Sequence, residues 1–414
     1  MATVTGILDW PARAEGRVRQ LNGSALVQRD DDPFVPLAFG ERFKLRHGLE
    51  VTVVVGHRPT GGGGGGGGRR RRRRGRGPRP PMDQQGGMGQ QGGGGGRPVV
   101  EEIVAIEGQA PDEFARSKPF EELTSIDPQP RLTLEYPGGP VSCRLADLFC
   151  PIGRGQRGLI VSPPKAGKTT LLKDVATSIL RNHRDVEMIL LLVDERPEEV
   201  TDFKRTFADF NEEGKRPRAV VIASSNDHEA ERHVAVSLLT MERAKRMVEA
   251  GKHVVVMLDS LTRLGRAFNR SKKYASSGRT MTGGIDAKAL EVPKQIFGSA
   301  RNTEEAGSLT MIATCLVDTG SAMDQVIFEE FKGTGNMELI LDRKISERRL
   351  FPAINLAASG TRKEHLLMNE QELKTVTALR RRLMAMPPHV QVEQLLAAMQ
   401  RFPTNDALVG GAGG

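Results

Sequence analysis

A short strand, a glycine-containing loop and a helix follow one another at residues 158–179, the order that a phosphate-binding loop requires. The apolar run 159–161 predicts a buried parallel strand, and the chain then turns through residues 162–167. Lys168 and Thr169 open a segment whose apolar residues recur at helical spacing, namely Leu171, Leu172, Val175, Ala176 and Ile179. Backbone N–H groups of such a loop and helix start point at one spot and favour an anion there.

Lysine and threonine at these positions suit the chemistry of a nucleoside triphosphate. Lys168 would reach the β- and γ-phosphates, and the Thr169 hydroxyl would ligate Mg²⁺. Ser162 stands where the usual pattern has its first glycine, so a chance Gly-Lys-Thr helix start is the alternative. Because the flanking strand and helix are both present, we predict a nucleotide phosphate site with Mg²⁺.

Two carboxylates follow other apolar strands and could complete this site. Asp259 comes directly after five apolar residues, and we predict that it holds Mg²⁺ through water. A cap for the helix that starts at Leu261 is the alternative role for Asp259. Glu195 is the candidate general base that orients and deprotonates an attacking water. An ordinary helix-start glutamate, stabilised by the helix dipole, is the alternative for Glu195.

From about residue 131 onward the chain alternates strands and helices. Apolar strands are expected at 187–193, 219–223, 253–258, 308–314 and 337–341. Asp227 could cap a long amphipathic helix that runs to about Ala250. The alternation predicts an α/β fold with a mostly parallel sheet and helices on both faces. Active groups of such sheets lie beyond the carboxyl ends of the strands, where Thr169, Glu195 and Asp259 fall.

The first 57 residues carry short apolar runs separated by turn residues. The runs lie at 6–8, 24–27, 34–37, 42–45 and 50–55, and the run 98–106 predicts one more strand. This spacing suggests a small β-barrel of the oligonucleotide-binding (OB) type, closed by the last strand. Any other small β-domain is the alternative. Residues 107–130 are polar and proline-containing, and we expect them to link the barrel to the domain at 131–414.

Residues 58–97 have a composition that cannot form a core. They hold ten arginines, one aspartate and a run of eight glycines, and their charge accounts for the net charge of +9. We predict a disordered insertion within the barrel that grips phosphates without sequence preference. A solvated linker without function and a nuclear targeting signal are the alternatives.

The remaining composition excludes several classes of protein. No run of about 18 apolar residues is present, so no membrane span is expected. Residues 1–10 lack a basic segment followed by an apolar one, so we expect no signal peptide. Cys143, Cys150 and Cys315 show no zinc spacing. Reduced thiols in a cytoplasmic protein are the simplest reading of these cysteines.

With these residues in hand, the chain resembles the bacterial transcription termination factor Rho family. The resemblance covers nearly all of residues 131–414 and rests on long blocks in the same order. The blocks lie at 151–161, 163–169, 194–201, 329–338 and 359–364. It implies a homohexameric ring of RecA-like motor domains. Such rings hydrolyse ATP at subunit interfaces and translocate 5′ to 3′ on single-stranded nascent RNA. They act as RNA–DNA helicases and contact RNA polymerase transiently.

The resemblance also implies roles for individual residues. Glu195 would be the catalytic base with Arg196 beside it, Arg362 the arginine finger given in trans, and Arg349 another interfacial arginine. Phe351 matches the residue that stacks on adenine. The other nucleotide and Mg²⁺ contacts would be Lys165, Ala166, Gly167, Lys168, Thr169, Thr170 and Asp259.

Two central RNA-binding loops are implied as well. The first comprises Ser277, Gly278, Arg279 and Thr280, and the second begins with Thr319, Gly320 and Ser321. Arg279 keeps the charge of the family's lysine in the first loop, whereas Ala322 replaces a lysine in the second. Without the family, either loop would be read as an ordinary surface loop.

The N-terminal domain departs further from the family. The strand near Gly6 lacks the two phenylalanines of the family pattern, which puts base stacking in doubt. We expect Phe34 to keep one aromatic position and Arg17, Arg19 and Arg42 to contact phosphate. The arginine-rich insertion would then compensate through salt-sensitive electrostatic capture.

Two other functions stay open. One is a related RecA-like ring, such as a DNA helicase or a rotary synthase subunit, and the blocks at 331–336 and 359–364 argue against it. The other is an RNA-binding or condensate-forming protein that hydrolyses little ATP. The joint presence of Lys168, Glu195, Asp259 and Arg362 argues against that function, because catalysis is what needs all four.

Overall fold

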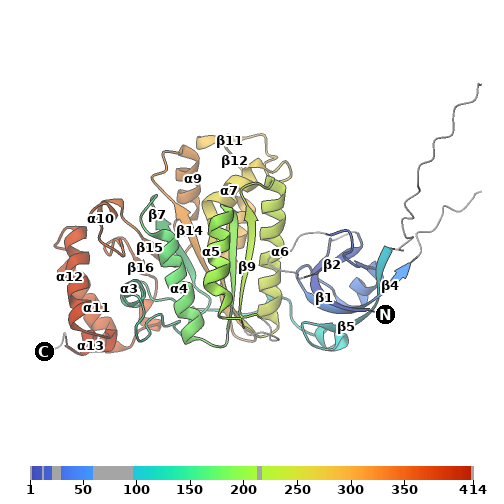
Figure 1. Ribbon diagram of the computed structural model, residues 1–414, viewed down its shortest axis with the longest axis horizontal. Coiled ribbons are helices and arrows are strands. Elements are labelled where there is room, and N and C mark those ends of the chain that lie inside the picture. Colours follow the sequence, from blue (N-terminus) through green and yellow to red (C-terminus); the bar gives the residue numbers. More distant parts are fainter. Residues whose placement is uncertain (1, 12–13, 21–28, 59–96, 212–216, 412–414) are drawn as a thin grey trace, which may run out of the picture.

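The computed structural model describes residues 2–11, 14–20, 29–58, 97–211 and 217–411. They form a small barrel and a larger α/β domain that lie side by side (Figure 1). The closed barrel and the RecA-like α/β architecture confirm the predicted fold class. Within the described residues no helix is long and apolar enough to cross a membrane.

The barrel is closed in the order β1-β2-β3-β5-β4. Its strands are β1 (Ala2–Asp9), β2 (Gly16–Gln20), β3 (Phe34–Val35), β4 (Glu50–Arg58) and β5 (Arg97–Ile106). Val51, Val53 and Val55 alternate inward along β4, which is the pattern of a half-buried strand. The last pair between β4 and β5 joins Arg58 to Arg97, so residues 59–96 connect two adjacent strands of one barrel.

Of the apolar runs expected in the barrel, 42–45 has a different structure and 24–27 lies outside the described residues. The run 42–45 is not a strand, because Arg42 and Phe43 end helix α1 (Leu37–Phe43) and Lys44 caps it in a left-handed conformation. Phe43 and Leu45 still enter the barrel core. The apolar side chains of this run therefore still pack in the barrel core, although the run is not a strand.

The α/β domain is built on a sheet whose main path is β16-β15-β7-β14-β10-β8-β9. Within this path, β9, β8, β10, β14, β7 and β15 are mutually parallel, and β16 is antiparallel at the edge. The strands are β6 (Ser125–Ile126), β7 (Arg157–Ser162), β8 (Val186–Glu195), β9 (Ala219–Ser225), β10 (His253–Asp259), β13 (Arg301–Thr303), β14 (Ser308–Leu316), β15 (Met337–Ile340) and β16 (Gly360–Thr361), with a separate hairpin of β11 (Thr280–Met281) and β12 (Ile285–Asp286).

Both faces of this sheet are covered. Along β8, Met188, Leu190 and Leu192 join one apolar cluster, whereas Ile189 and Leu191 join another on the opposite face. The helices are α2 (Pro111–Phe114), α3 (Val141–Phe149), α4 (Lys168–Asn182), α5 (Pro197–Ala208), α6 (Ala230–Glu249), α7 (Leu261–Arg270), α8 (Glu291–Gly298), α9 (Ala322–Phe331), α10 (Arg343–Glu347), α11 (Glu370–Leu383), α12 (Pro388–Arg401) and α13 (Asn405–Gly411), with 3₁₀ turns η1 (Phe120–Glu122), η2 (Thr282–Gly284) and η3 (Glu364–Leu366).

The long helix α6 begins later than predicted. Its N-cap residue is Glu229, and no side chain caps the helix, so the proposed cap by Asp227 is wrong. Residues 226–229 instead form a turn after β9, in which the His228 amide donates to the Ser225 carbonyl. This turn places the start of the helix beyond the reach expected for Asp227.

Helix α6 also contacts the barrel. Its Arg243 contacts Glu107 and lies 3.4 Å from Glu50, both at the ends of barrel strands. Ile7 of β1 belongs to the apolar cluster of the α/β domain. Gly48 approaches α6 so closely that an added Cβ would lie 2.5 Å from the Arg243 backbone nitrogen. The barrel is therefore fixed to α6 by an apolar contact, buried ion pairs and a close backbone approach.

The Gly48→Ala variant should unfold at lower urea concentration than Gly251→Ala. Both glycines have positive φ, 86° and 80°, so both substitutions carry a similar backbone cost of about 1–2 kcal/mol. Only Gly48 faces a backbone clash, since nothing lies within 4 Å of a Cβ at Gly251. Equal unfolding midpoints for the two variants would contradict the close approach.

Candidate functional site: a phosphate-binding loop at the sheet edge

The phosphate-binding loop joins the end of β7 to the start of α4. Gly167 is the N-cap residue of α4 and has φ 89°, a conformation that glycine adopts without strain. No side chain caps this helix, so the first-turn N–H groups of α4 are not satisfied by a capping side chain. Together with the helix dipole, these groups favour an anion next to Gly167.

Lys168 and Asp259 form a close ion pair at this edge of the sheet. The Lys168 ammonium contacts both oxygens of the Asp259 carboxylate. Thr314 of β14 donates to the Asp259 Oδ1 atom at 2.8 Å. Asp259 has no exposed surface, so its charge depends on these partners. Ser260, rather than Asp259, accepts from the Arg263 amide and caps α7, which removes the alternative of Asp259 as the cap.

The donor set suits a hard cation. Thr169 in the first turn of α4 supplies a hydroxyl and Asp259 a carboxylate, and Mg²⁺ prefers oxygen ligands of this kind. Within the described residues no cluster of three or more His, Cys, Asp or Glu could hold a metal alone. Mg²⁺ commonly takes its remaining ligands from phosphates and water. When bound, the ion would neutralise charge that develops on a transferred phosphoryl group.

Glu195 ends β8 and is 1% exposed. Burial raises the pKa of its carboxyl group, and the nearby Asp259 charge raises this pKa further. The Arg263 guanidinium lies 3.0 Å from the Glu195 Oε1 atom and opposes both effects by lowering the pKa. Glu195 thus combines burial, an oriented carboxylate and a raised pKa, which are properties of a general base. Its neighbour Arg196 is exposed and is the N-cap residue of α5.

Arg263 was missed by the sequence analysis. It lies one helical turn after Asp259, and it also donates to the Asp194 carbonyl. One turn further along α7, Arg266 donates to both oxygens of Asp324, which also accepts from the Thr319 hydroxyl. Helix α7 therefore connects Glu195 to the loop that begins at Thr319. Only the spacing from Asp259 could have signalled Arg263, because its partner comes from a different strand.

A cavity of about 500 Å³ opens beside the phosphate-binding loop. Lys165, Ala166, Gly167 and Thr170 line it. Phe351 is 46% exposed and lines the same cavity. A large exposed aromatic ring beside a phosphate site is suited to packing on a nucleotide base. The structure therefore brings Phe351 and the loop together, as the resemblance implies.

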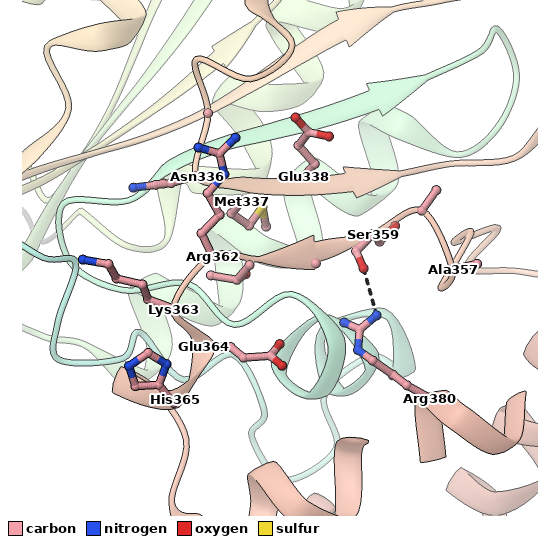
Figure 2. Close-up of a pocket in the computed structure, with 14 residues that line it drawn as sticks. Asn336, Met337, Glu338, Ala357, Ser359, Arg362, Lys363, Glu364, His365 and Arg380 are labelled. Atoms are coloured by element: carbon pink, nitrogen blue, oxygen red, sulfur yellow. Dashed lines mark hydrogen bonds between the residues drawn. The ribbon is translucent and has the colours of Figure 1, made fainter. Parts of the chain in front are cut away.

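Arg362 does not lie at the phosphate-binding loop of its own chain. It follows β16, whose Thr361 pairs with Met337, and Met337 pairs with Gly158 near the start of β7. The loop follows the other end of β7. Arg362 is exposed and lines a separate cavity of about 600 Å³ with Glu338 and other residues (Figure 2). Arg349 is exposed too and precedes Phe351 by two residues.

The two loops with proposed RNA contacts lie close to one another. Residues 277–280 form an exposed turn in which Gly278 has φ 67°, and they lead into the hairpin of β11 and β12. Gly283 approaches the start of α9, where an added Cβ would lie 2.8 Å from the Met323 backbone nitrogen. Ser321 caps α9 by accepting from the Asp324 amide. In Figure 1, α9, β11 and β12 gather at one end of the domain.

The barrel residues proposed to contact RNA lie in different surroundings. The ring of Phe34 is covered by guanidinium groups from both flanking strands, Arg17 at 4.2 Å and Arg97 at 3.0 Å from its centroid. Arg19 is only 8% exposed and pairs with Asp9 and Asp32, so a phosphate contact by Arg19 is withdrawn.

The exposed guanidinium of Arg42 lies over the Phe43 ring, 4.7 Å from its centroid. Arg42 therefore remains available for phosphate, as Arg17 does. Arg97, at the start of β5, was missed by the sequence analysis, and only barrel closure places it on Phe34.

The fold and the site define a P-loop ATPase domain. Residues 142–361 match the model of the ATP synthase alpha/beta family, nucleotide-binding domain. Among solved structures, the chain is similar to a type III secretion system ATPase of pathogenic bacteria, with a TM-score of 0.55 and 24% identity over 76% of this chain and 86% of that one. The assembled ATPase EscN of enteropathogenic E. coli gives a TM-score of 0.57 at 21% identity over 72% and 74% of the two chains.

Three relatives are transcription termination factors Rho. The chain is 52% identical to the Borreliella burgdorferi protein over 73% of this chain and 57% of that protein. It is 52% identical to the Aquifex aeolicus protein over 73% and 67% of the two chains, and to the Allochromatium vinosum protein over 71% and 68%. The chain belongs to the transcription termination factor Rho family. The matched part thus spans little more than half of the Borreliella protein and about two thirds of the others.

Magnesium ADP should raise the melting temperature of the chain, and Lys168→Ala should lose most of that rise. Binding to the folded state stabilises it by about 2.7 kcal/mol at a ligand concentration one hundred times Kd. Lys173→Ala is the matched control, because Lys173 lies on the same helix and pairs with the exposed Asp202. The measurement is thermal unfolding with and without nucleotide. An equal rise in wild type and Lys168→Ala would contradict the phosphate role of Lys168.

Proposed function

We propose that this chain is an RNA-dependent ATPase that works as a hexameric ring and ends transcription. In this proposal the ring translocates 5′ to 3′ on nascent RNA and releases transcripts from RNA polymerase, with RNA–DNA helicase activity. The observation that carries the proposal is the separation of two groups of residues along the sheet. Lys168, Glu195 and Asp259 meet at one edge of the sheet, whereas Arg362 lies at the other end of the neighbouring strands.

Phosphoryl transfer can use catalytic groups from two subunits. An arginine finger stabilises charge in the transition state, and it can be supplied by a neighbouring subunit. Arg362 of one copy, with Arg349, would complete the site formed by Lys165, Lys168 and Thr169 of the next. Phe351 would pack on adenine. Ring formation then follows from chemistry, because one copy cannot complete its own site.

Glu195 would act as the general base toward the attacking water, with Arg196 beside it at the subunit interface. Asp259 and Thr169 would hold Mg²⁺, and the nucleotide phosphates would replace Asp259 as the partner of Lys168. Arg263 lies 3.0 Å from the Glu195 Oε1 atom, and its charge lowers the pKa of this buried carboxyl group, which favours the ionised form. Removing general-base catalysis typically costs 10²–10⁴-fold in rate.

RNA would contact the exposed loop 277–280 and the loop 319–321 in the centre of the ring. Arg279 supplies a positive charge there, whereas Ala322 supplies none. The contacts of Arg266 with Asp324 and of Arg263 with Glu195 support a physical link between RNA and hydrolysis through α7. The barrel, with Arg17 and the arginine-rich residues 58–97, would capture RNA mainly through its phosphates. We place this activity in the cytoplasm.

RNA should stimulate the release of phosphate from ATP, and Glu195→Ala should abolish the stimulated rate. The assay compares no RNA, poly-cytidine and poly-uridine at fixed salt. Similar stimulation by both polymers is expected, because Arg17 and Arg97 cover the Phe34 ring that was proposed for base stacking. Absent stimulation by either polymer would contradict the RNA-dependent motor and favour an RNA-binding protein with little hydrolysis.

The pH dependence of kcat should report the raised pKa of Glu195. A general base acts when deprotonated, so kcat should fall as pH drops through a pKa that burial holds above the ordinary value of 4.5. Arg263 lowers this pKa, so Arg263→Gln should move the acidic limb to higher pH.

Arg205→Gln removes the same charge from an exposed site on α5 and should leave the limb in place. The measurement is kcat at saturating magnesium ATP and RNA across pH. An acidic limb that stays put, or moves to lower pH, in Arg263→Gln would contradict the assignment.

A further inference from the structure

The nucleotide cavity contains a carboxylate that the proposed chemistry does not use. Asp174 of α4 and Ser142 of α3 line the cavity beside Phe351. The Ser142 hydroxyl donates to the Asp174 Oδ2 atom at 2.5 Å, and Ser142 is 7% exposed. Asp174 is half-buried. The other residues that line the cavity are largely apolar or belong to the phosphate-binding loop. Burying a carboxylate there costs free energy, and a hydrogen bond from a ligand would offset that cost.

Asp174 lies on α4 away from the end that begins the phosphate-binding site. Lys168 opens α4 at the phosphate end, and Asp174 lies six residues later, about 9 Å along the helix axis. Lys165 and Thr170, the other polar side chains that line this cavity, belong to the phosphate-binding loop and the first turn of α4. Ser142 and Asp174 therefore remain as the polar side chains that line the cavity outside these segments.

The geometry points to Asp174 as the residue that reads the 6-amino group of adenine, an assignment that rests on the proposed ATP-binding function. Its Oδ2 atom accepts from the Ser142 hydroxyl, which holds the carboxylate in one orientation, and the carboxylate retains further acceptor sites. Adenine offers a donor at its 6-position, whereas guanine offers an acceptor there. A guanine 6-oxo group in the place of the 6-amino group would therefore not donate to Asp174.

The bond between Ser142 and Asp174 also ties α3 to α4, and a purely structural role would predict a different outcome. A structural tie affects the melting temperature and all nucleotides equally. A base-reading role changes the ratio between nucleotides. Relative affinities of ATP, GTP and purine riboside triphosphate, which lacks the 6-amino group, therefore separate the two roles.

The experiment displaces N-methylanthraniloyl-ADP from the full-length chain with each of these three triphosphates in the presence of Mg²⁺. Wild type should bind ATP about tenfold more tightly than purine riboside triphosphate, as expected for one hydrogen bond to a charged acceptor. Asp174→Ala should bring this ratio close to one. Ser142→Ala removes the hydroxyl that orients the carboxylate and should lower this ratio part of the way toward one.

Asp202→Ala is the control, because it removes an exposed carboxylate of α5 and should leave every ratio unchanged. An unchanged ATP ratio in Asp174→Ala, or no ATP preference in wild type, would overturn the assignment while leaving nucleotide binding intact. If Asp174→Ala does not fold, an unchanged ratio between the affinities for ATP and purine riboside triphosphate in Ser142→Ala would overturn it. No binding of the fluorescent nucleotide by wild type would overturn the proposed function and this assignment together.

Discussion

The contact between Lys168 and Asp259 is the interaction on which the proposed site depends. It joins the first residue of α4 to the last residue of β10, and Thr314 of β14 holds the same carboxylate. A buried charge is tolerated only when it is paired, so these partners must stay together unless another ion takes their place. A nucleotide with Mg²⁺ offers such a replacement, because phosphate would attract the lysine and the cation would attract the carboxylate. The same buried charges that stabilise the sheet edge thus favour binding.

Helix α7 extends this arrangement toward a second region of the domain. Its N-terminus follows Asp259, and its Arg263 and Arg266 pair with Glu195 and Asp324 respectively. One packed helix therefore contacts both places, as a coupling between them would require. The barrel is fixed to α6 through Arg243, and α6 packs against α7. The proposed RNA contacts and the proposed ATP site therefore share one continuous set of packed elements.

The sequence predicts much of this architecture because local signals determine it. Apolar runs predict the parallel strands, and the rule that active groups lie beyond their carboxyl ends brings Thr169, Glu195 and Asp259 to one edge. Contacts between distant segments were not predictable. Arg263 pairs with a residue of another strand, and Arg97 reaches Phe34 only because residues on either side of a long insertion pair in the barrel. The predicted cap at Asp227 and the predicted strand at 42–45 were wrong, because capping and helix formation depend on the local turn geometry.

The division of the ATP site between copies is the central claim, and mixing two inactive variants tests it most directly. Glu195→Ala removes the proposed base and Arg362→Ala removes the proposed finger, so each variant alone should show little RNA-stimulated hydrolysis. In mixed rings, an Arg362→Ala copy would supply Glu195 at an interface where a Glu195→Ala copy supplies Arg362. The account predicts that activity returns when the two variants are mixed and assembled together. Mixtures no more active than the separate variants would contradict it, because every site built within one copy would stay defective.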